Sequence, residues 1–254
     1  WARFDPQQLA TPEAFSEAPA LVWGWYRWRA ARVLRAQPNA GHLGLARLEL
    51  MMLSHADSDH AGGALAIQRA MPVGAVLSGE PERLPTVLDA RSCRTGQRWT
   101  WNQVIFSVWR WPQATNGNQA SCVLMVEAAG ERLLLTGDID AQAERALIDG
   151  GMEVNARWLL VPHHGSSGSS SPGFVAATGA RLALVAAGYR NRFGHPHEPV
   201  VRRWRYHGAE VLATPASGAI RVWLDGDGLA VRERRPWRRR LWDRPLPPPG
   251  EQEE

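Results

Sequence analysis

Histidine clustering limits what this chain can fold into more than any other feature of its sequence. Six of the eight histidines stand in three tight pairs, which are His55 and His60, His163 and His164, and His195 and His197. Each pair comes just after an apolar stretch that is typical of a buried strand. Side chains at consecutive strand ends converge on one edge of a layered α/β domain, where sites are usually built. We therefore expect an α/β fold with one site assembled from distant segments.

The stretch from His55 to His60 holds four potential metal ligands in six positions. A loop between a strand and a helix can fold such residues around a pair of ions, whereas a strand would point alternate side chains to opposite faces. The alternative is a solvated polar loop in which Asp59 caps the following helix. Asp138 follows the apolar run 133–135 and, by itself, would also be read more often as a helix cap. The agreement between these segments favours a metal site.

Strand-like and helix-like segments alternate along the middle of the chain, and this alternation predicts an α/β domain. Residues 122–127 and 132–135 form a predicted hairpin with a four-residue connection, and residues 99–111 form a long strand or half of a hairpin. The other expected strands are 48–53, 74–77, 158–161, 181–187, 210–213, 220–224 and 229–232. One helix is expected to begin at residue 61, and the other expected helices are 140–149, 172–178 and 199–206.

Composition excludes several classes of protein. With 254 residues, 44% of them hydrophobic and 21% charged, the chain has the makeup of a soluble globular protein that needs no disulfide staples. No apolar run approaches the roughly 18–20 residues that cross a bilayer. The two cysteines, Cys93 and Cys122, are too few for a disulfide framework, lack metal-ligand spacing and indicate nothing about the compartment.

The two ends of the chain differ from its middle. Residues 1–46 contain four tryptophans without sustained periodicity, so no helix or strand is predicted there. Residues 236–254 are rich in Arg, Pro and Glu, which favours a solvated, loosely ordered tail. Because all 29 basic residues are arginine and many crowd this end, binding of nucleic acid or of an anionic membrane surface is the alternative.

Four motifs, in consistent order over about residues 47–224, resemble the C-terminal metallo-β-lactamase-like domain of the ComEC family of bacterial competence DNA-uptake channels. They are His-x-Asp-x-Asp-His-x-Gly-Gly from His55, Thr-Gly-Asp ending at Asp138, Pro-His-His-Gly-Ser from Pro162, and Gly-His-Pro-His from Gly194. The superfamily has histidine at the third position of the first motif, where this chain has Asp57, as the ComEC branch does. The resemblance implies an α/β (αββα) metallo-β-lactamase-like sandwich.

The resemblance also implies a set of metal ligands. His55 and Asp57 resemble ligands of a first ion, Asp59 and His60 those of a second, and Asp138 the carboxylate that bridges both. His164 is preferred only slightly over His163 as the late histidine ligand. His195 and His197 complete the site or contact the scissile phosphate. The candidate metal ligands are therefore His55, Asp57, Asp59, His60, Asp138 and His164, and the candidate catalytic residues are Asp59, His163, His195 and His197.

Two divalent ions are expected, and the ligand set affects which ions they are. Because Asp57 replaces an imidazole, the set is richer in oxygen, which favours Mn²⁺ while Zn²⁺ stays possible. The middle histidine of the superfamily is not found between His60 and Asp138. This chain offers Asn116, Asn118 and Ser121 there.

The chain departs from the family at its front. The opening strand with Asp-Val-Gly-Gln-Gly, and the Asp-x-Gly turn after it, are missing from residues 1–46. We therefore expect a sandwich that lacks its opening strands and has an unpaired sheet edge beside residues 48–53. Three parts are expected: an atypical and non-native segment 1–46, a metallo-β-lactamase-like domain 47–235 and the tail 236–254.

The function implied by the resemblance is that of a metal-dependent nuclease that degrades one DNA strand during DNA uptake. Its partners would be single-stranded DNA, the membrane channel portion of the uptake protein and other competence machinery. The domain would lie on the outer side of the bacterial inner membrane, with this chain soluble by itself. The alternatives are a catalytically silent DNA-handling module and a stand-alone metallohydrolase of another substrate.

Overall fold

The computed structural model describes residues 12–22, 24, 47–225 and 228–237, which fall into two compact units. The first unit is Trp1–Leu50 with Gly63–Gly74. It contains helix α2 (Pro12–Glu17), helix α6 (Ala64–Ala70) and a parallel bridge between Leu48 and Val73. Helix α2 was not expected from the sequence, and most of residues 1–46 lies outside the described residues.

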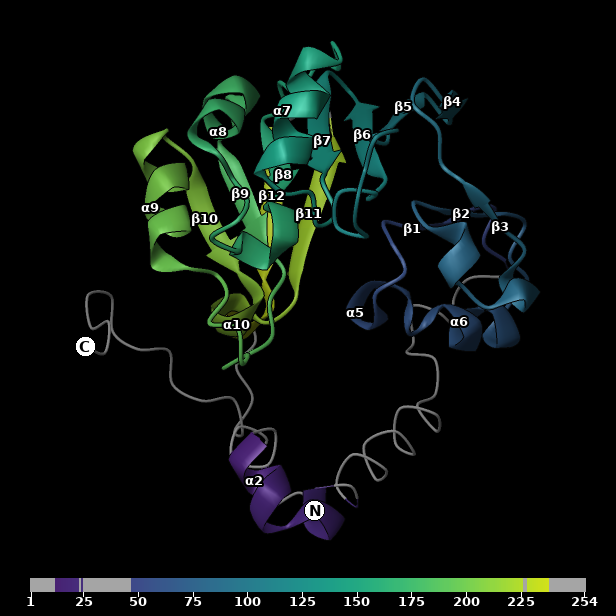
Figure 1. The fold of residues 1–254 in the computed structure, drawn as a ribbon. Coiled ribbons are helices and arrows are strands. Elements are labelled where there is room, and N and C mark those ends of the chain that lie inside the picture. The colour runs from purple at the N-terminus through teal and green to yellow at the C-terminus, as the bar shows by residue number, and fades with distance from the viewer. Residues whose placement is uncertain (1–11, 23, 25–46, 226–227, 238–254) are drawn as a thin grey trace. The chain divides into compact units, whose positions relative to one another are not determined.

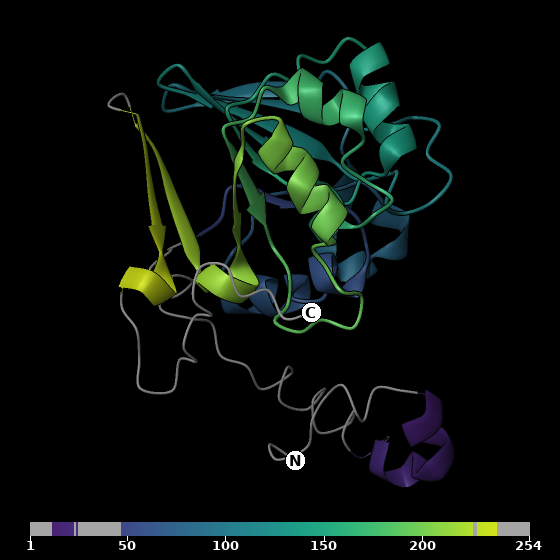
Figure 2. The ribbon, with the colours of Figure 1, turned by 90° about the vertical axis from the view of Figure 1, so that its left-hand side faces the viewer.

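The second unit, Met51–Gly62 with Ala75–Glu254, is built on a seven-stranded sheet in the order β10-β9-β8-β7-β6-β5-β4. Its strands are β4 (Arg98–Trp101), β5 (Val104–Trp109), β6 (Val123–Ala128), β7 (Glu131–Leu135), β8 (Trp158–Leu160), β9 (Leu182–Val185) and β10 (Glu210–Ala213). The first four are antiparallel, and the strands from β7 to β10 are parallel. Helices α7 (Ala141–Asp149), α8 (Pro172–Thr178) and α9 (Glu198–Tyr206) cover one face of the sheet (Figures 1 and 2).

A smaller parallel sheet, in the order β1-β2-β3, belongs to the same unit. It consists of β1 (Met51–Leu53), β2 (Val76–Ser78) and β3 (Ala90–Ser92). Among the described strands β1 pairs only with β2. The unpaired edge expected from the sequence concerns residues 1–46, most of which lie outside the described residues. The remaining elements are α5 (Ser58–Ala61), the 3-10 turns η1 (Pro81–Arg83), η2 (Thr86–Leu88) and η3 (Pro162–Gly165), the hairpin β11 (Ile220–Asp225) with β12 (Gly228–Glu233), α10 (Thr214–Ser217) and α11 (Arg234–Trp237).

The main core follows from the alternation of side chains along the central strands. Met125, Leu134 and Leu159 point to the helical face and are buried there. Phe174 and Trp204, from α8 and α9, pack edge to face with ring centroids 6.4 Å apart. Within the described residues no helix is long and apolar enough to cross a membrane.

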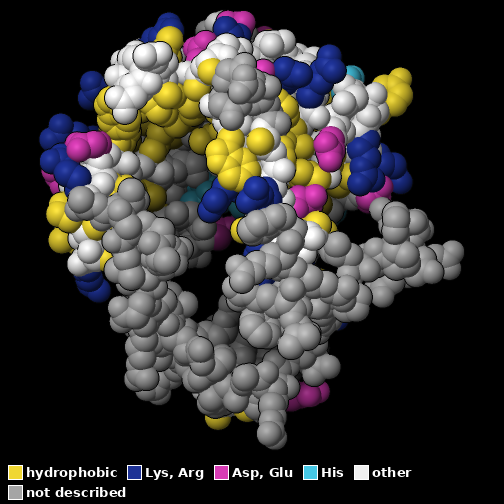
Figure 3. Space-filling view, turned by 180° about the vertical axis from the view of Figure 1, so that it is seen from behind, with side chains coloured by type: hydrophobic (Ala, Val, Ile, Leu, Met, Phe, Trp, Pro, Cys, Tyr) yellow, Lys and Arg dark blue, Asp and Glu magenta, His cyan; other side chains and the backbone are white. Residues whose placement is uncertain are grey.

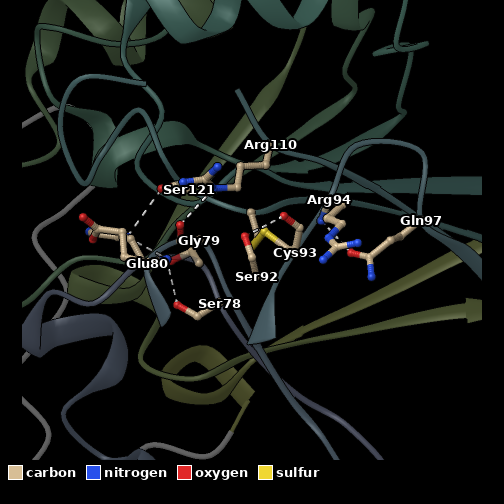
Figure 4. Close-up of a disulfide and its surroundings, with 12 residues drawn as sticks. Ser78, Gly79, Glu80, Ser92, Cys93, Arg94, Gln97, Arg110 and Ser121 are labelled. Carbon is tan, nitrogen blue, oxygen red and sulfur yellow. Dashed lines mark hydrogen bonds between the residues drawn. A yellow bond between two sulfur atoms is a disulfide. The ribbon is translucent and has the colours of Figure 1, made fainter. Parts of the chain in front are cut away.

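A second apolar cluster includes a disulfide. Cys93, which follows β3, is bonded to Cys122, which precedes β6, and both are buried beside Val108 (Figure 4). The two cysteines thus form a single covalent tie between the small sheet and the large one. This pairing was not predicted, because two cysteines at a spacing of 29 have no recognisable sequence pattern.

The alternation of elements matches the expectation, and two details correct it. The hairpin of β6 and β7 turns through two residues, Ala129 and Gly130, and not through four. Both have positive φ, 51° and 81°, which lets a two-residue turn follow the twist of the strands. The helix expected from residue 61 is also divided, since α5 ends at Ala61 and α6 begins at Ala64.

Candidate metal centre

The histidine motifs lie in loops at the carboxyl ends of strands. His55 to His60 run from β1 into α5, Asp138 follows β7, and His164 lies in η3 directly after β8. Histidine is visible inside a hollow bordered by hydrophobic side chains (Figure 3). A cavity of about 370 Å³ is lined by Asp59, His60, Asp138 and His164 together with apolar side chains such as Leu124, Leu135 and Leu160.

Imidazole nitrogens and carboxylate oxygens converge at this cavity. The Nε2 atom of His60 lies 3.2 Å from Nε2 of His164 and 3.2 Å from Oδ1 of Asp138. The Nε2 atom of His164 is also 3.4 Å from Oδ2 of Asp138 and 3.4 Å from Oδ2 of Asp59. The Nε2 atom of His55 is 3.5 Å from Oδ2 of Asp57. The donor atoms of Asp59, His60, Asp138 and His164 therefore meet in one place, and His55 lies near His60 and Asp138. Asp57 contacts His55 but belongs to neither group of close donor atoms.

In His55, His60 and His164 the other ring nitrogen, Nδ1, also has a hydrogen-bonding partner. The Oγ atom of Ser54 lies 3.1 Å from Nδ1 of His55 and 2.9 Å from Nδ1 of His60. The Nδ1 atom of His164 donates to the carbonyl of Ala186 at 2.6 Å. Such partners fix the ring orientation of metal-binding histidines and leave Nε2 for the ion.

The residues fit divalent metal ions. The Nε2 atom of His55 is buried and has no hydrogen-bond partner among the described residues, which is costly for a polar atom unless it binds something. The described residues contain two groups of three donor atoms, and within each group the atoms lie within 4.8 Å of one another. One group is His55, His60 and Asp138, and the other is Asp59, His60 and His164. Imidazole nitrogens with carboxylate oxygens suit both Zn²⁺ and Mn²⁺. His60 belongs to both groups, which differs from the expected pairing of His55 with Asp57 and of Asp59 with His60.

Charge within the centre is strongly coupled. Burial by itself would raise the pKa of Asp138, but hydrogen bonds from His164 and His60 outweigh it and hold the pKa of this carboxyl well below its usual range. The same contact with Asp138 raises the pKa of His164 to about 9. Burial, with the neighbouring His60, lowers the pKa of His55. Asp138 is thus an anion shared by two imidazole groups.

His163 and His164 are among the residues other than glycine with positive φ, at 50° and 55°. Residues other than glycine rarely adopt this left-handed conformation, and it persists only where neighbours enforce it. The N–H of His163 donates to the carbonyl of Gly137 at 3.1 Å, and its own carbonyl accepts from Ser166 at 2.8 Å. These bonds turn the His164 ring toward Asp138.

The candidate catalytic histidines lie around the metal ligands. The Nε2 atom of His163 is 3.9 Å from Oδ2 of Asp138 and 3.4 Å from Nδ2 of Asn118. The ring of His195 lies 5.9 Å from that of His163 and 6.4 Å from that of His164, measured between centroids. His197 is next to His195 at 5.2 Å and precedes the first residue of α9. His164 is closer than His163 to Asp138, in agreement with the preference for His164 as a ligand.

Several residues that support the centre were not predicted. Ser121 accepts a hydrogen bond from the N–H of Asp138 at 3.1 Å and lies 3.4 Å from Nδ1 of His55. The buried Glu80 accepts from the N–H of Ala56 at 3.1 Å and pairs with Arg83 at 2.9 Å. The Nη2 atom of Arg83 then lies 3.3 Å from Oδ1 of Asp57. Of these residues, only Ser121 had a signal in the sequence, as one of the three polar residues found where the superfamily has its middle histidine.

Comparison with known proteins gives a consistent family. A family model described as the metallo-beta-lactamase superfamily matches residues 22–188. Competence protein ComA of Neisseria gonorrhoeae is 38% identical over 201 residues, which are 78% of this chain and 28% of that protein. ComE operon protein 3 of Bacillus subtilis is 30% identical over 193 residues, which are 70% of this chain and 25% of that protein. The chain thus spans about a quarter of the length of these relatives.

A shorter similarity concerns a different class of protein. An NAD-dependent protein deacylase of Aeropyrum pernix is 65% identical over 49 residues, which are 19% of this chain and 20% of that protein. A match of this size covers too little of either protein to establish a family.

Proposed function

The chain belongs to the metallo-β-lactamase superfamily, and from this premise we propose that it is a metal-dependent phosphodiesterase that cleaves one strand of DNA during DNA uptake. One observation carries the proposal. The Nε2 atoms of His60 and His164 face each other at 3.2 Å, with the carboxylate of Asp138 within 3.4 Å of both. Such a cluster of nitrogen and oxygen donors around an anionic centre is suited to holding cations.

In this proposal two ions are held by His55, Asp57, Asp59, His60, Asp138 and His164, with Mn²⁺ favoured because Asp57 supplies oxygen in place of nitrogen. When bound, such ions supply a Lewis acid for a phosphodiester oxygen and lower the pKa of a water molecule toward neutrality. The chain's own residues orient these groups. Ser54 and Ala186 hold the rings of His60 and His164, and Arg83 holds Asp57.

Proton transfer falls to the histidines around the ligands. His163, with Nε2 at 3.9 Å from Asp138, is placed to hold a proton for the departing alkoxide of the DNA strand. His195 and His197 lie beside it and would contact the scissile phosphate. The exposed carboxylate of Asp59 lines the cavity beside His164, where it would bind one of the ions and help to position the phosphate.

The setting of this activity is part of the proposal. The named relatives are competence proteins about four times as long as the matched region, which supports a role beside the membrane channel portion of an uptake protein and other competence machinery. A buried disulfide between Cys93 and Cys122 supports a location on the outer side of the bacterial inner membrane, because disulfides persist in oxidising compartments.

The test is incubation of labelled single-stranded DNA with the purified chain, with and without Mn²⁺, beside the variants Asp59→Ala and Asp149→Ala. Asp149 is an exposed aspartate at the end of α7 and serves as the matched control. We expect Mn²⁺-dependent cleavage that is lost in Asp59→Ala and retained in Asp149→Ala. Binding of DNA without cleavage at any metal concentration would contradict the proposal and support the silent DNA-handling module. Cleavage of a small phosphodiester, but not of DNA, would support a metallohydrolase of another substrate.

A further inference from the structure

An exposed loop of aromatic and basic residues, 188–194, leads into the metal centre. Tyr189 and Phe193 are among the most exposed large hydrophobic side chains of the described residues, at 52% and 59%. Arg190 and Arg192, in the same loop, are exposed as well. We call residues 188–194 the aromatic loop. The loop thus exposes two rings and two cations within seven residues.

Each ring of this loop has a guanidinium group beside it. The Cζ atom of Arg192 lies 4.6 Å from the centroid of the Phe193 ring, and that of Arg190 lies 5.6 Å from the Tyr189 ring. Aromatic faces stack on nucleobases whatever the sequence, and arginine binds the phosphates between them. The loop therefore offers the two kinds of contact that a nucleotide needs.

A continuous run of rings connects the aromatic loop with the metal ligands. The Phe193 ring stacks near the His195 ring, with centroids 5.6 Å apart and an angle of 22° between planes. His195 lies in turn 6.4 Å from His164 at an angle of 26°. A base stacked on Phe193 would thus lie beside His195, the residue that the proposed function assigns to the scissile phosphate.

The loop is held in shape by one side chain. The Nδ2 atom of Asn191 donates to the carbonyls of Gly188, at 3.0 Å, and of His195, at 2.6 Å, while its Oδ1 accepts from the N–H of His195 at 3.0 Å. These bonds fix the loop before any ligand arrives, and such preorganisation lowers the entropic cost of binding.

We propose that the aromatic loop binds an unpaired nucleobase through Phe193 and the adjacent phosphate through Arg192, and thereby selects single strands. This inference rests on the proposed function, since it assigns a substrate-binding surface to that same site. A base within a duplex is paired and stacked on its neighbours, so it cannot lie flat on Phe193. Tyr189 and Arg190 extend the same surface along the strand.

The test separates bases from phosphates. Fluorescence anisotropy of the full chain, in buffer with chelator so that no cleavage occurs, compares a labelled oligothymidylate with an abasic strand of the same length. We expect the unaltered chain to bind the oligothymidylate at least about tenfold more tightly, which corresponds to ~1.4 kcal/mol. Phe193→Ala should remove this preference, and Phe193→Tyr should keep it. Arg192→Ala should weaken binding of both strands and lower the salt dependence of binding.

Tyr206→Ala is the matched control, because Tyr206 is an exposed aromatic residue at the end of α9, outside the loop. It should keep the full preference for bases. If Phe193→Ala keeps the preference, or Tyr206→Ala loses it to the same extent, or the unaltered chain binds both strands alike, the proposal is overturned.

The hydrolase part of the proposed function, as distinct from its DNA substrate, is checked separately by Mn²⁺-dependent hydrolysis of bis(p-nitrophenyl) phosphate by the unaltered chain. A chain that hydrolyses this small diester but shows no preference for bases overturns the loop assignment and leaves the hydrolase in place. A chain that binds bases through Phe193 but hydrolyses no diester supports the loop and contradicts the hydrolase.

Discussion

At the scale of single residues, one hydroxyl group orients two of the candidate ligands. Ser54 Oγ lies 3.1 Å from Nδ1 of His55 and 2.9 Å from Nδ1 of His60. We predict that Ser54→Ala lowers the affinity for Mn²⁺ or Zn²⁺ by about 10–100-fold, because both rings lose the partner that fixes them. Calorimetric titration of the metal-free chain measures this change.

Ser58→Ala is the matched control for this prediction, since Ser58 is an exposed serine at the first residue of α5. This variant should bind metal like the unaltered chain. Equal affinities for Ser54→Ala and Ser58→Ala would show that the hydroxyl does not orient the ligands.

The limit of sequence analysis is clear at these residues. The proximity of His55, His60, Asp138 and His164 could be predicted, because candidate metal ligands combine unusual residue types with short spacings. Ser54 and the carbonyl of Ala186 could not, since a serine is common and a backbone carbonyl has no signature in a sequence. Which residues support a ligand depends on the packing of segments that are distant in the chain.

At the scale of elements, the disulfide between Cys93 and Cys122 ties the segment after β3 to the start of β6. Closing a loop of this length restricts the unfolded chain, and a sequence separation of 29 corresponds to about 3–4 kcal/mol of stability. We predict that dithiothreitol lowers the melting temperature of the unaltered chain. The double variant Cys93→Ser with Cys122→Ser should melt at that lower temperature with or without the reductant. A melting temperature that reduction leaves unchanged would contradict this role.

Helix α7 is joined to the loop before α8 by a buried carboxylate. Glu144 is fully buried and accepts from the N–H groups of Ser170, at 2.5 Å, and Ser171, at 2.7 Å. Burial raises the pKa of Glu144 above that of an ordinary glutamate, despite these hydrogen bonds. The Glu144 carboxylate therefore binds a proton more readily in the folded chain than in the unfolded chain. The ionisation of Glu144 then costs stability as pH rises from the ordinary glutamate pKa through the raised one.

Glu144→Gln removes this titration, so its effect on unfolding is predicted to depend on pH. The free energy of unfolding of the variant minus that of the unaltered chain should increase as pH rises from the ordinary glutamate pKa through the raised pKa of Glu144. A constant difference introduced by the amide does not affect this trend. Urea unfolding of both proteins at a series of pH values gives the difference. A difference that is flat with pH would mean that the pKa of Glu144 is not raised in the folded chain.

At the scale of the whole molecule, the sequence predicts the alternation of strands and helices but not how they divide. The predicted helix 172–178 and the predicted strand 210–213 agree with α8 and β10 residue for residue, because turn residues border them. Strand β3 was missed, since Ala90–Ser92 is short and has no apolar pattern. The division into two units was not predicted either, because Gly63–Gly74 clusters with Trp1–Leu50, far from it in the sequence.

Residues 1–46 provide the last prediction, that this segment is not a proper part of the fold. Trp1–Leu50 clusters in a different unit from the strands that bear the candidate ligands, and the segment contains none of the opening motif that the ComEC resemblance implies, although the superfamily match begins at residue 22. Brief digestion with trypsin should remove most of the segment, and mass spectrometry identifies the new amino terminus.

The trimmed chain should keep the metal centre, because all six candidate ligands follow residue 47 in the sequence. A ligand that binds only the folded state stabilises it by about 2.7 kcal/mol at a concentration 100 times its dissociation constant. Millimolar Mn²⁺ or Zn²⁺ should therefore raise the melting temperature of the trimmed and the intact chain equally, and a chelator should reverse the rise. Protection of residues 1–46 from trypsin, or loss of the metal effect on trimming, would instead make this segment an integral part of the domain, supporting the sheet at the edge of β1.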